Sequence, residues 1–271
     1  MAVSHGLRQH SKFGGRFRKR RDSEEENIYL DFNRATPEIV QEILFNVVNQ
    51  DVNISKKLGY LNGFVKLCVQ RQKEFGISYK DIFCCLRIAF FHEACEVRAA
   101  GLRACRYVLK NLETVETFLQ SKLQFLVSRS LDISLDNRIE RVQALRLMRK
   151  VLDLNPSGFP SAFSKCLVAI ANEGSQERDI IRPCLATLAQ LAVLNPQACI
   201  EAKGVSALMK NIVEIPQVQA SEAILGVIFF LINHPSTRDL MNNDFGLENL
   251  LAPFTDCHYR FPSTLDGCAR Y

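Results

Sequence analysis

Histidine and cysteine are the residues of this chain that could ligate a metal or act in catalysis. The 271 residues include five histidines and ten cysteines. The spacing His92-x-x-Cys95 could put two ligands on one face of a helix, whereas a structural zinc site needs four ligands. We therefore expect neither a metal site nor a bound cofactor.

The cysteines are better explained by packing than by chemistry. No Cys-x-x-Cys pair occurs in the sequence. A free cysteine within an apolar segment of helical period packs as a small hydrophobic side chain. We expect this role for Cys84, Cys105, Cys166 and Cys184. Without a signal peptide, ten cysteines are typical of reduced thiols in a cytosolic or nuclear protein.

The motifs of the common enzyme classes are absent from the sequence. It contains no Gly-x-Ser-x-Gly, no glycine-rich phosphate loop, no dinucleotide fingerprint and no zinc-protease motif. No carboxylate or nucleophile can be placed near His92 from spacing alone. The sequence therefore predicts a protein that is not an enzyme and has no catalytic residues.

Two arginines occupy equivalent positions in similar stretches of sequence and could bind an anion. Arg98 and Arg141 each stand three residues before a small residue, Gly101 and Ala144. Such a pair could recognise an anion, or each arginine could pair with an acid in the adjacent repeat. We favour the pairing.

Positive charge gathers at the N-terminus. Residues 1–21 carry seven Lys or Arg and no acid, so the remaining residues sum to −2 within the formal charge of +5. A near-neutral body does not suggest a nucleic-acid-binding groove. We expect residues 1–27 to form a disordered tail. The alternatives for the basic block are a nuclear-import patch or weak contact with an acidic surface. Ser23, between basic and acidic blocks, is a candidate phosphorylation site because phosphate would reverse the local charge.

The elements that would position these residues follow a repeat of about 40 residues. Three helix-length segments end at a proline, and twelve residues before each proline stands a small residue followed by Leu or Ile. The prolines are Pro156, Pro196 and Pro235, and the small residues are Ala144, Cys184 and Ala223. An earlier copy of the small-aliphatic pair is Gly101-Leu102.

This repeat has a direct physical interpretation. A small residue allows a neighbouring helix to approach closely, and proline stops a helix because it lacks an amide donor. Amphipathic segments fill the intervals, with apolar residues at i, i+3, i+4 and i+7. One such segment runs from Val115 to Val127. A helix pair of this size cannot bury its apolar face alone, so stacked neighbours must complete the core.

The sequence therefore predicts an all-α solenoid of the armadillo or HEAT type, with about four to five helical repeats. We expect it to span residues 28–255 between the tail 1–27 and an irregular C-terminal tail, 256–271. Upstream helices are expected over 37–50, 55–70 and 79–93. Gly204 and Gly246 resemble the turn that precedes the second helix of an armadillo repeat.

No transmembrane segment is expected. The longest apolar stretch covers residues 223–232, which is shorter than the roughly 20 residues that cross a bilayer. We expect a soluble intracellular chain located in the cytoplasm, with a nuclear fraction through the basic tail. Contact with a membrane would be peripheral and made only through a larger complex.

Several distinctive strings resemble the N-terminal region of the Rictor family, the rapamycin-insensitive companions of TOR. They are residues 23–27 (SEEEN), 57–64 (KLGYLNGF), 96–104 (EVRAAGLRA), 140–150 (ERVQALRLMRK) and 250–260 (LLAPFTDCHYR). Family members are far longer, so the resemblance implies an N-terminal fragment or short form. It also implies a non-catalytic scaffold in TOR complex two, where TOR kinase and the Sin-type subunit would be its partners. The implied outputs are Akt-class kinase signalling and organisation of the actin cytoskeleton.

Two other functions remain open from the sequence. The chain could be a free armadillo-like adaptor that binds peptides or partner helices and competes with the full-length scaffold. It could instead have a nuclear or nucleic-acid role that depends on the basic tail. Binding to the Sin-type subunit without kinase would indicate the adaptor, and loss of binding on deletion of residues 1–21 would indicate the nuclear role.

Overall fold

The computed structural model describes residues 28, 30–70, 75–132, 137–173, 178–214, 226–227, 229–235 and 238. Within them the chain forms helices and no strand. The helices are α1 (Thr36–Val48), α2 (Ile54–Gln70), α3 (Tyr79–Ala89), α4 (Cys95–Val108), α5 (Leu112–Gln120), α6 (Leu123–Asp132), α7 (Arg138–Leu154), α8 (Ser161–Asn172), α9 (Arg178–Leu194), α10 (Pro196–Glu201) and α11 (Gly204–Glu214). The expected all-α fold is confirmed.

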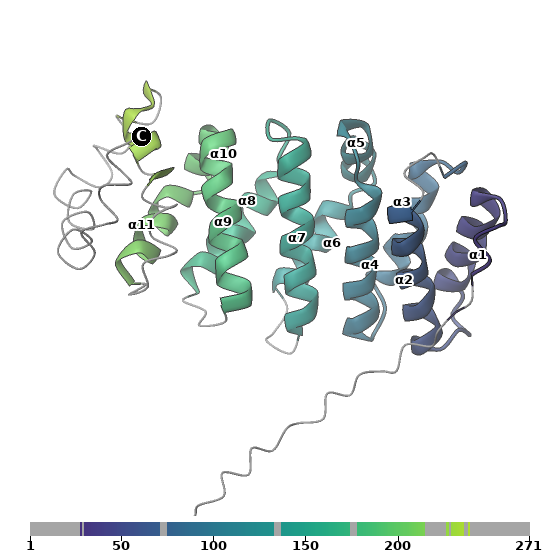
Figure 1. Cartoon of the computed structure of the whole chain (residues 1–271). Helices are drawn as coiled ribbons and strands as arrows, with labels where there is room; N and C mark the ends of the chain where they lie inside the picture. Colours follow the sequence, from purple (N-terminus) through teal and green to yellow (C-terminus); the bar gives the residue numbers. More distant parts are fainter. Residues whose placement is uncertain are drawn as a thin grey trace, which may run out of the picture.

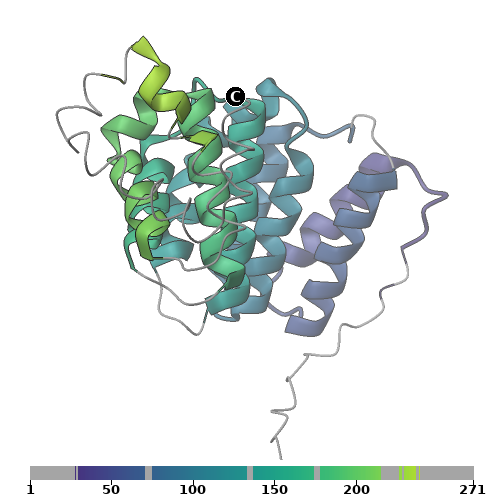
Figure 2. The same ribbon diagram turned by 60° about the vertical axis from the view of Figure 1, so that its left-hand side comes forward.

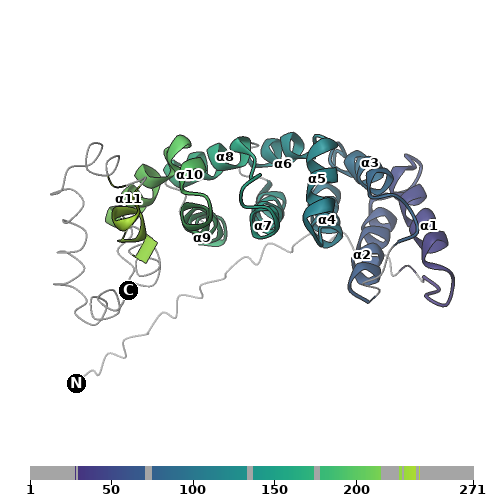
Figure 3. The ribbon, with the colours of Figure 1, turned by 90° about the horizontal axis from the view of Figure 1, so that it is seen from above.

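The helices form a row in two layers. The long helices α4, α7 and α9 stand side by side (Figures 1 and 2), and α2 packs against α4 to extend this layer. Helices α3, α5, α6, α8, α10 and α11 form the other layer (Figure 3). Seen from above, the row bends into an arc, and the inner layer of α2, α4, α7 and α9 lies on its concave side. This is the solenoid arrangement that the repeat predicts.

One apolar core runs along the row between the layers. Buried side chains extend from Leu30 and Ile39 at one end to Leu208 and Leu231 at the other. Each helix adds a stripe of aliphatic or aromatic residues to its neighbours, which is the packing expected of stacked repeats. The core is therefore continuous while each module touches only nearby modules.

Local sequence signals start several helices. The Ser78 side chain accepts a hydrogen bond from the Asp81 amide at the start of α3. Asn111 and Thr114 form a capping box at α5, in which each side chain accepts from the other residue's backbone. These bonds satisfy amides that have no partner inside a helix.

At Gly101, the small residue of the repeat allows close helix contact, as predicted. A Cβ added at Gly101 would lie 2.9 Å from the Cβ of Ala89 and 3.2 Å from the Phe90 ring. Asn195 both ends α9 and caps α10, since its side chain accepts from the Ala198 amide and Pro196 follows as the first residue of that helix. The Asn-Pro signal thus closes one helix and opens the next.

The structure corrects the two-helix unit. The segment from Val115 to Val127 was expected to be one helix, but it is split between α5 and α6 by Lys122, whose φ is 58°. Lys203 has φ 61° at the equivalent turn between α10 and α11. A short helix thus precedes the outer helix in these repeats. The armadillo-like turn at Gly204 is borne out, because α11 begins there.

Two further expectations need correction. Helix α3 ends at Ala89 rather than near residue 93, because the chain turns there to begin α4. Cys84 is exposed, whereas Cys105 and Cys184 are buried and Cys166 is half-buried. The apolar stripe of α3 runs through Ile82, Phe83 and Leu86 instead.

Some predicted features lie outside the described residues. They include the tail 1–27 with Ser23, the small residue Ala223, the turn at Gly246 and the C-terminal tail 256–271. No described helix combines the length and apolar character that a membrane crossing requires.

Candidate functional site

Arg98 and Arg141 form ion pairs that connect neighbouring helices of the row. Arg98 on α4 donates from Nε to the carboxylate of Glu140 on α7 at 2.8 Å, and its Nη2 lies 2.8 Å from the same oxygen. The Glu140 side chain is 1% exposed and that of Arg98 is 15% exposed. This ion pair is therefore largely shielded from water, where Coulomb attraction is strong.

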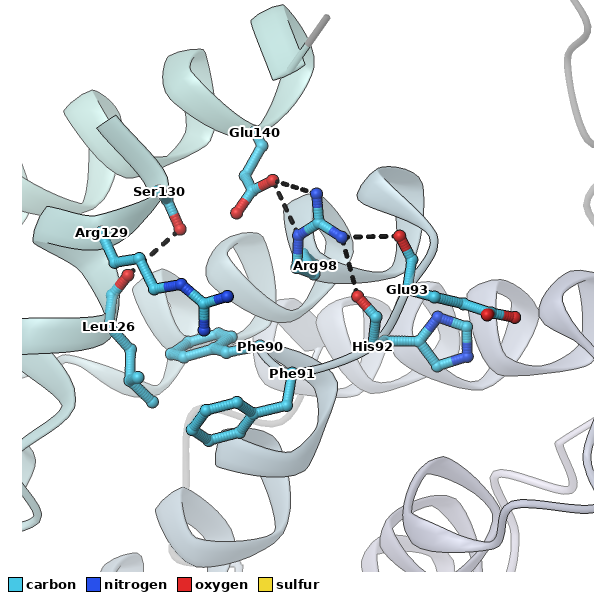
Figure 4. A pocket seen from close by; sticks show the side chains of 9 residues that line it. All are labelled: Phe90, Phe91, His92, Glu93, Arg98, Leu126, Arg129, Ser130 and Glu140. Carbon is cyan, nitrogen blue, oxygen red and sulfur yellow. Dashed lines mark hydrogen bonds and ion pairs between the residues drawn. The ribbon is translucent and has the colours of Figure 1, made fainter. Parts of the chain in front are cut away.

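The remaining donors of Arg98 are also used. Its Nη1 donates to the backbone carbonyls of His92 and Glu93, both at 2.7 Å (Figure 4). Because this guanidinium holds a carboxylate and two carbonyls, it has little capacity left for an external anion. The predicted pairing is confirmed at Arg98.

Arg141 makes the second connection of this kind. It is buried, and its Nη2 donates to the Glu173 carboxylate at the end of α8 at 2.9 Å. The Glu173 side chain is half-exposed. The pairing predicted for Arg141 is therefore confirmed too, although its Nε is buried without a hydrogen-bond partner.

A pocket of about 310 Å³ opens beside the Arg98–Glu140 pair. Figure 4 shows Phe90 and Phe91 along one wall and Arg129 and Ser130 of α6 opposite. The Ser130 hydroxyl donates to the Leu126 carbonyl at 3.2 Å. The lining thus combines apolar rings with polar groups, of which the Ser130 hydroxyl, Arg98 and Glu140 already have partners. Among the described residues this arrangement does not place a nucleophile beside a base.

The structure does not build a metal site at His92 and Cys95. His92 lies in the turn before α4, and its Nδ1 accepts from the Ala94 amide at 3.1 Å. Burial lowers the pKa of His92, and repulsion from Lys57 lowers it further. Among the residues that the structure describes, no group of three His, Cys, Asp or Glu side chains could hold a metal ion.

Several buried thiols are poor nucleophiles. Burial raises the pKa of Cys68, Cys184 and Cys199 to about 12. The Cys184 sulfur also donates to the Leu167 carbonyl at 3.1 Å. A thiol with such a pKa is almost entirely protonated at neutral pH, so these cysteines act in packing, as the sequence analysis predicts for Cys184.

The inner layer carries a group of cations that the sequence analysis did not single out. We call Arg103 and Arg106 of α4 and Arg146 and Arg149 of α7 the inner cationic cluster. Arg103, Arg146 and Arg149 are exposed, and Arg106 is partly exposed with its guanidinium 5.1 Å from the Tyr107 ring centroid. In the described part of the chain, no carboxylate pairs with any of the four.

The repeat contained a signal for this cluster. Arg146 and Arg149 follow Arg103 and Arg106 by 43 residues, the interval that separates Gly101 from Ala144. These equivalent positions lie on α4 and α7, which pack against each other. Burial is the main cause that lowers the pKa of Arg106, and repulsion from Arg146 and Arg103 contributes. The arrangement suits contact with a negatively charged surface.

Residues 58–266 match a protein-family model described as the N-terminal part of the rapamycin-insensitive companion of mTOR. The chain is 42% identical over 258 residues to the proteins named rapamycin-insensitive companion of mTOR in Mus musculus and Homo sapiens. Each alignment covers 93% of this chain and 15% of the mammalian protein. The chain thus spans a small fraction of the length of these relatives.

A more distant relative is the Saccharomyces cerevisiae protein named Target of rapamycin complex 2 subunit TSC11. It is 23% identical over 160 residues, which cover 59% of this chain and 11% of the yeast protein. The homologues therefore include a protein whose name identifies it as a subunit of this complex.

Solved structures of designed armadillo repeat proteins share the fold. One of them, in complex with the peptide (KR)4, has a TM-score of 0.61 and 14% identity over 87% of this chain and 97% of its own. Another, designed for modular peptide recognition, has a TM-score of 0.59 and 15% identity over 87% and 98%. At this identity the likeness establishes an armadillo-like solenoid.

Proposed function

Since the chain belongs to the Rictor family, we propose that it acts as a non-catalytic scaffold component of TOR complex two. The observation that carries the proposal is 42% identity across 93% of the chain to the mammalian companions of mTOR. In this role the chain would contribute the N-terminal part of the scaffold. TOR kinase and the Sin-type subunit are its proposed partners.

The geometry suits a scaffold because it offers a long, preorganised surface. Adjacent modules are joined by packing and by polar contacts between inner helices, such as Arg103 with Asn62 and Gln190 with Asp153. These contacts reduce relative movement of the modules before a partner binds. A surface that is already ordered loses less entropy on association.

Co-purification tests the scaffold proposal. The tagged chain is expressed in cells, and TOR kinase and the Sin-type subunit are quantified in the purified material. A full-length mammalian relative serves as the positive control. We expect both subunits with the short chain. If the full-length control recovers them and the short chain recovers neither, the proposal is wrong for this chain.

A second candidate function is that of a free adaptor that competes with the full-length scaffold. It is favoured by the likeness to designed armadillo proteins, one of which was solved with a bound peptide. This function requires binding to the purified Sin-type subunit without kinase. Increasing amounts of the chain would then displace the full-length relative from that subunit and reduce Akt-class kinase phosphorylation and actin organisation in cells.

We also propose a cytoplasmic location, with any nuclear fraction depending on the basic residues 1–21. Fluorescence imaging of the intact chain and a variant lacking these residues tests this. We expect the intact chain mainly in the cytoplasm and any nuclear signal to fall on deletion. A mainly nuclear distribution in both would contradict the proposal.

A further inference from the structure

The inner cationic cluster is an unneutralised charge on an otherwise near-neutral body. Its four arginines come from two packed helices at equivalent repeat positions, and no described carboxylate pairs with them. By contrast, Arg98 and Arg141 on the same two helices each have an acid partner. The cluster is therefore distinct from the ion pairs that fasten the modules.

An acidic peptide segment is the ligand that complements this surface. Packed helices lie about 8–10 Å apart, and an extended chain advances about 3.3 Å per residue. Carboxylates two or three residues apart can therefore reach arginines on both helices. Arginine suits carboxylate because its planar donors can form paired hydrogen bonds. The ring of Tyr107 beside Arg106 adds an apolar surface for the aliphatic parts of the peptide's side chains.

The chain itself carries such a segment a few residues before the first helices of the row. Residues 22–26 contain Asp22 and three consecutive glutamates. They come four to eight positions before Leu30. The Leu30 side chain packs against Gly63 of α2 so closely that a Cβ at position 63 would clash with it. The neighbouring Asn62 accepts a hydrogen bond from Arg103 at 3.3 Å. Leu30 therefore fixes the chain to the part of α2 that touches the cluster.

The linker to Leu30 is long compared with the spacing of the helices. At about 3.3–3.6 Å per residue, four to eight residues span up to roughly 13–29 Å, whereas packed helices lie about 8–10 Å apart. A short linker of this kind gives a tethered segment a high effective concentration, so weak charge contacts can suffice for binding. We propose that the inner cationic cluster is a binding site for acidic peptide segments and that residues 22–26 of the same chain occupy it.

A competition experiment on the full-length chain tests this. The probe is a fluorescent peptide with the sequence of residues 22–28, and its binding is followed by fluorescence anisotropy at low salt. One variant neutralises the chain's own segment (D22N/E24Q/E25Q/E26Q). A second removes three arginines of the cluster (R103Q/R106Q/R146Q). The control removes three exposed cations from α3 and α8 (K80Q/R87Q/K165Q), with the same loss of charge.

We expect the neutralised segment to strengthen probe binding by at least about threefold, because the internal competitor is lost. The cluster variant should weaken probe binding by at least about tenfold, whereas the control variant should change it by less than about twofold. Both variants lose three positive charges, so their non-specific attraction for the probe falls equally. The single variant Arg146→Gln, at an exposed position, should weaken binding in the same direction. Circular dichroism establishes that each variant is folded.

Two results would overturn the proposal. If the control and cluster variants weaken the probe equally, the cluster is not a specific site. If neutralising residues 22–26 leaves probe affinity unchanged, the internal segment is not the occupant and its carboxylates pair elsewhere, for example with the preceding basic block. Neither result depends on assembly into TOR complex two, so this test and the co-purification can fail separately.

Discussion

At the scale of single residues, the ion pair between Arg98 of α4 and Glu140 of α7 is the most shielded from solvent among the described residues. Arg98 is held by one carboxylate and two backbone carbonyls, all between 2.7 and 2.8 Å away. Breaking a shielded pair leaves the remaining charge without compensation, which costs more than the pair itself contributes. Glu140 therefore matters to the fold beyond its own contacts.

We predict that Glu140→Ala lowers the free energy of unfolding by about 3 kcal/mol, because Arg98 loses its buried counter-charge. The matched control is Glu42→Ala, which removes a partner of Arg34 from a more exposed pair. That change should cost less than about 1 kcal/mol. Chemical denaturation of the three proteins measures the difference. Equal losses in both variants would show that the α4–α7 tie has no special role.

We predict that stability falls as pH drops through the ordinary pKa of His92, near 6.5. Burial lowers the pKa in the folded chain, so the unfolded chain binds the proton first and is favoured by acid. Protonation of Nδ1 would also remove the acceptor for the Ala94 amide.

The test of this pH dependence is His92→Asn, whose side-chain oxygen can still accept from that amide. Urea midpoints between about pH 7 and pH 5 should fall less steeply in the variant than in the parent, since the asparagine does not titrate. Identical slopes in the two proteins would mean that another group causes the acid sensitivity.

The sequence predicted the roles of Arg98 and Arg141 because the repeat gives them equivalent positions. It misplaced Cys84, since α3 directs that residue to solvent and leaves its neighbour Cys85 half-buried. A shift of one residue rotates a side chain by about 100° around a helix. The inner cationic cluster was missed because each arginine, taken singly, resembles a solvated surface residue.

At the scale of elements, the turns between short and outer helices carry backbone strain. Lys122 between α5 and α6 has φ 58°, in the left-handed region where side chains other than glycine are disfavoured. We predict that Lys122→Gly raises the free energy of unfolding by about 0.5 kcal/mol. The free energy gained by relieving this strain is larger than the free-energy cost of the additional conformational entropy that glycine gives the unfolded chain.

The control for Lys122→Gly is the same substitution inside a helix. Lys165 is exposed in the middle of α8, where glycine should lower stability by roughly 0.7 kcal/mol because of its poor helix propensity. Thermal denaturation should thus give opposite signs for the two variants. A loss of stability in both would contradict the assignment of strain to the turn.

The helix ends differed in how well the sequence revealed them. Asn155 and Asn195 mark the ends of α7 and α9, where the predicted stops stand. The break at Lys122 has no such signal, because the apolar period continues from α5 into α6 without Gly or Pro. At Pro183 the reverse holds: proline usually interrupts a helix, yet this residue lies inside α9. Local sequence signals alone therefore decide neither case.

At the scale of the whole molecule, the row of helices makes stability a local property. Helix α7 packs on α4 and α9 in its own layer, and α1 packs on α2 and α3. In such a row each module is stabilised by its neighbours rather than by a common centre. The 40-residue period predicted this architecture, whereas the bend of the arc depends on small rotations between modules that no sequence pattern records.

Hydrogen exchange on two core variants can test this local coupling. We predict that Leu145→Ala, in the middle of α7, accelerates exchange mainly in α4, α7 and α9. Val47→Ala, in α1, should accelerate exchange mainly in α1, α2 and α3. Both side chains are almost fully buried, and a Leu→Ala change in a core costs about 2–5 kcal/mol. Local opening should therefore be visible by mass spectrometry without global unfolding.

The comparison between the two variants separates a row from a closed core. In a row, the damage from Val47→Ala fades with distance, so α9 to α11 keep their protection while α1 loses it. In a cooperative closed core, each variant would lower exchange protection in all helices. The size of that drop would depend only on how much the variant lowers the global free energy of unfolding. Uniform acceleration in both variants would therefore contradict nearest-neighbour stabilisation. It would also weaken the case for a scaffold, because a partner docked on one module could then alter the whole surface.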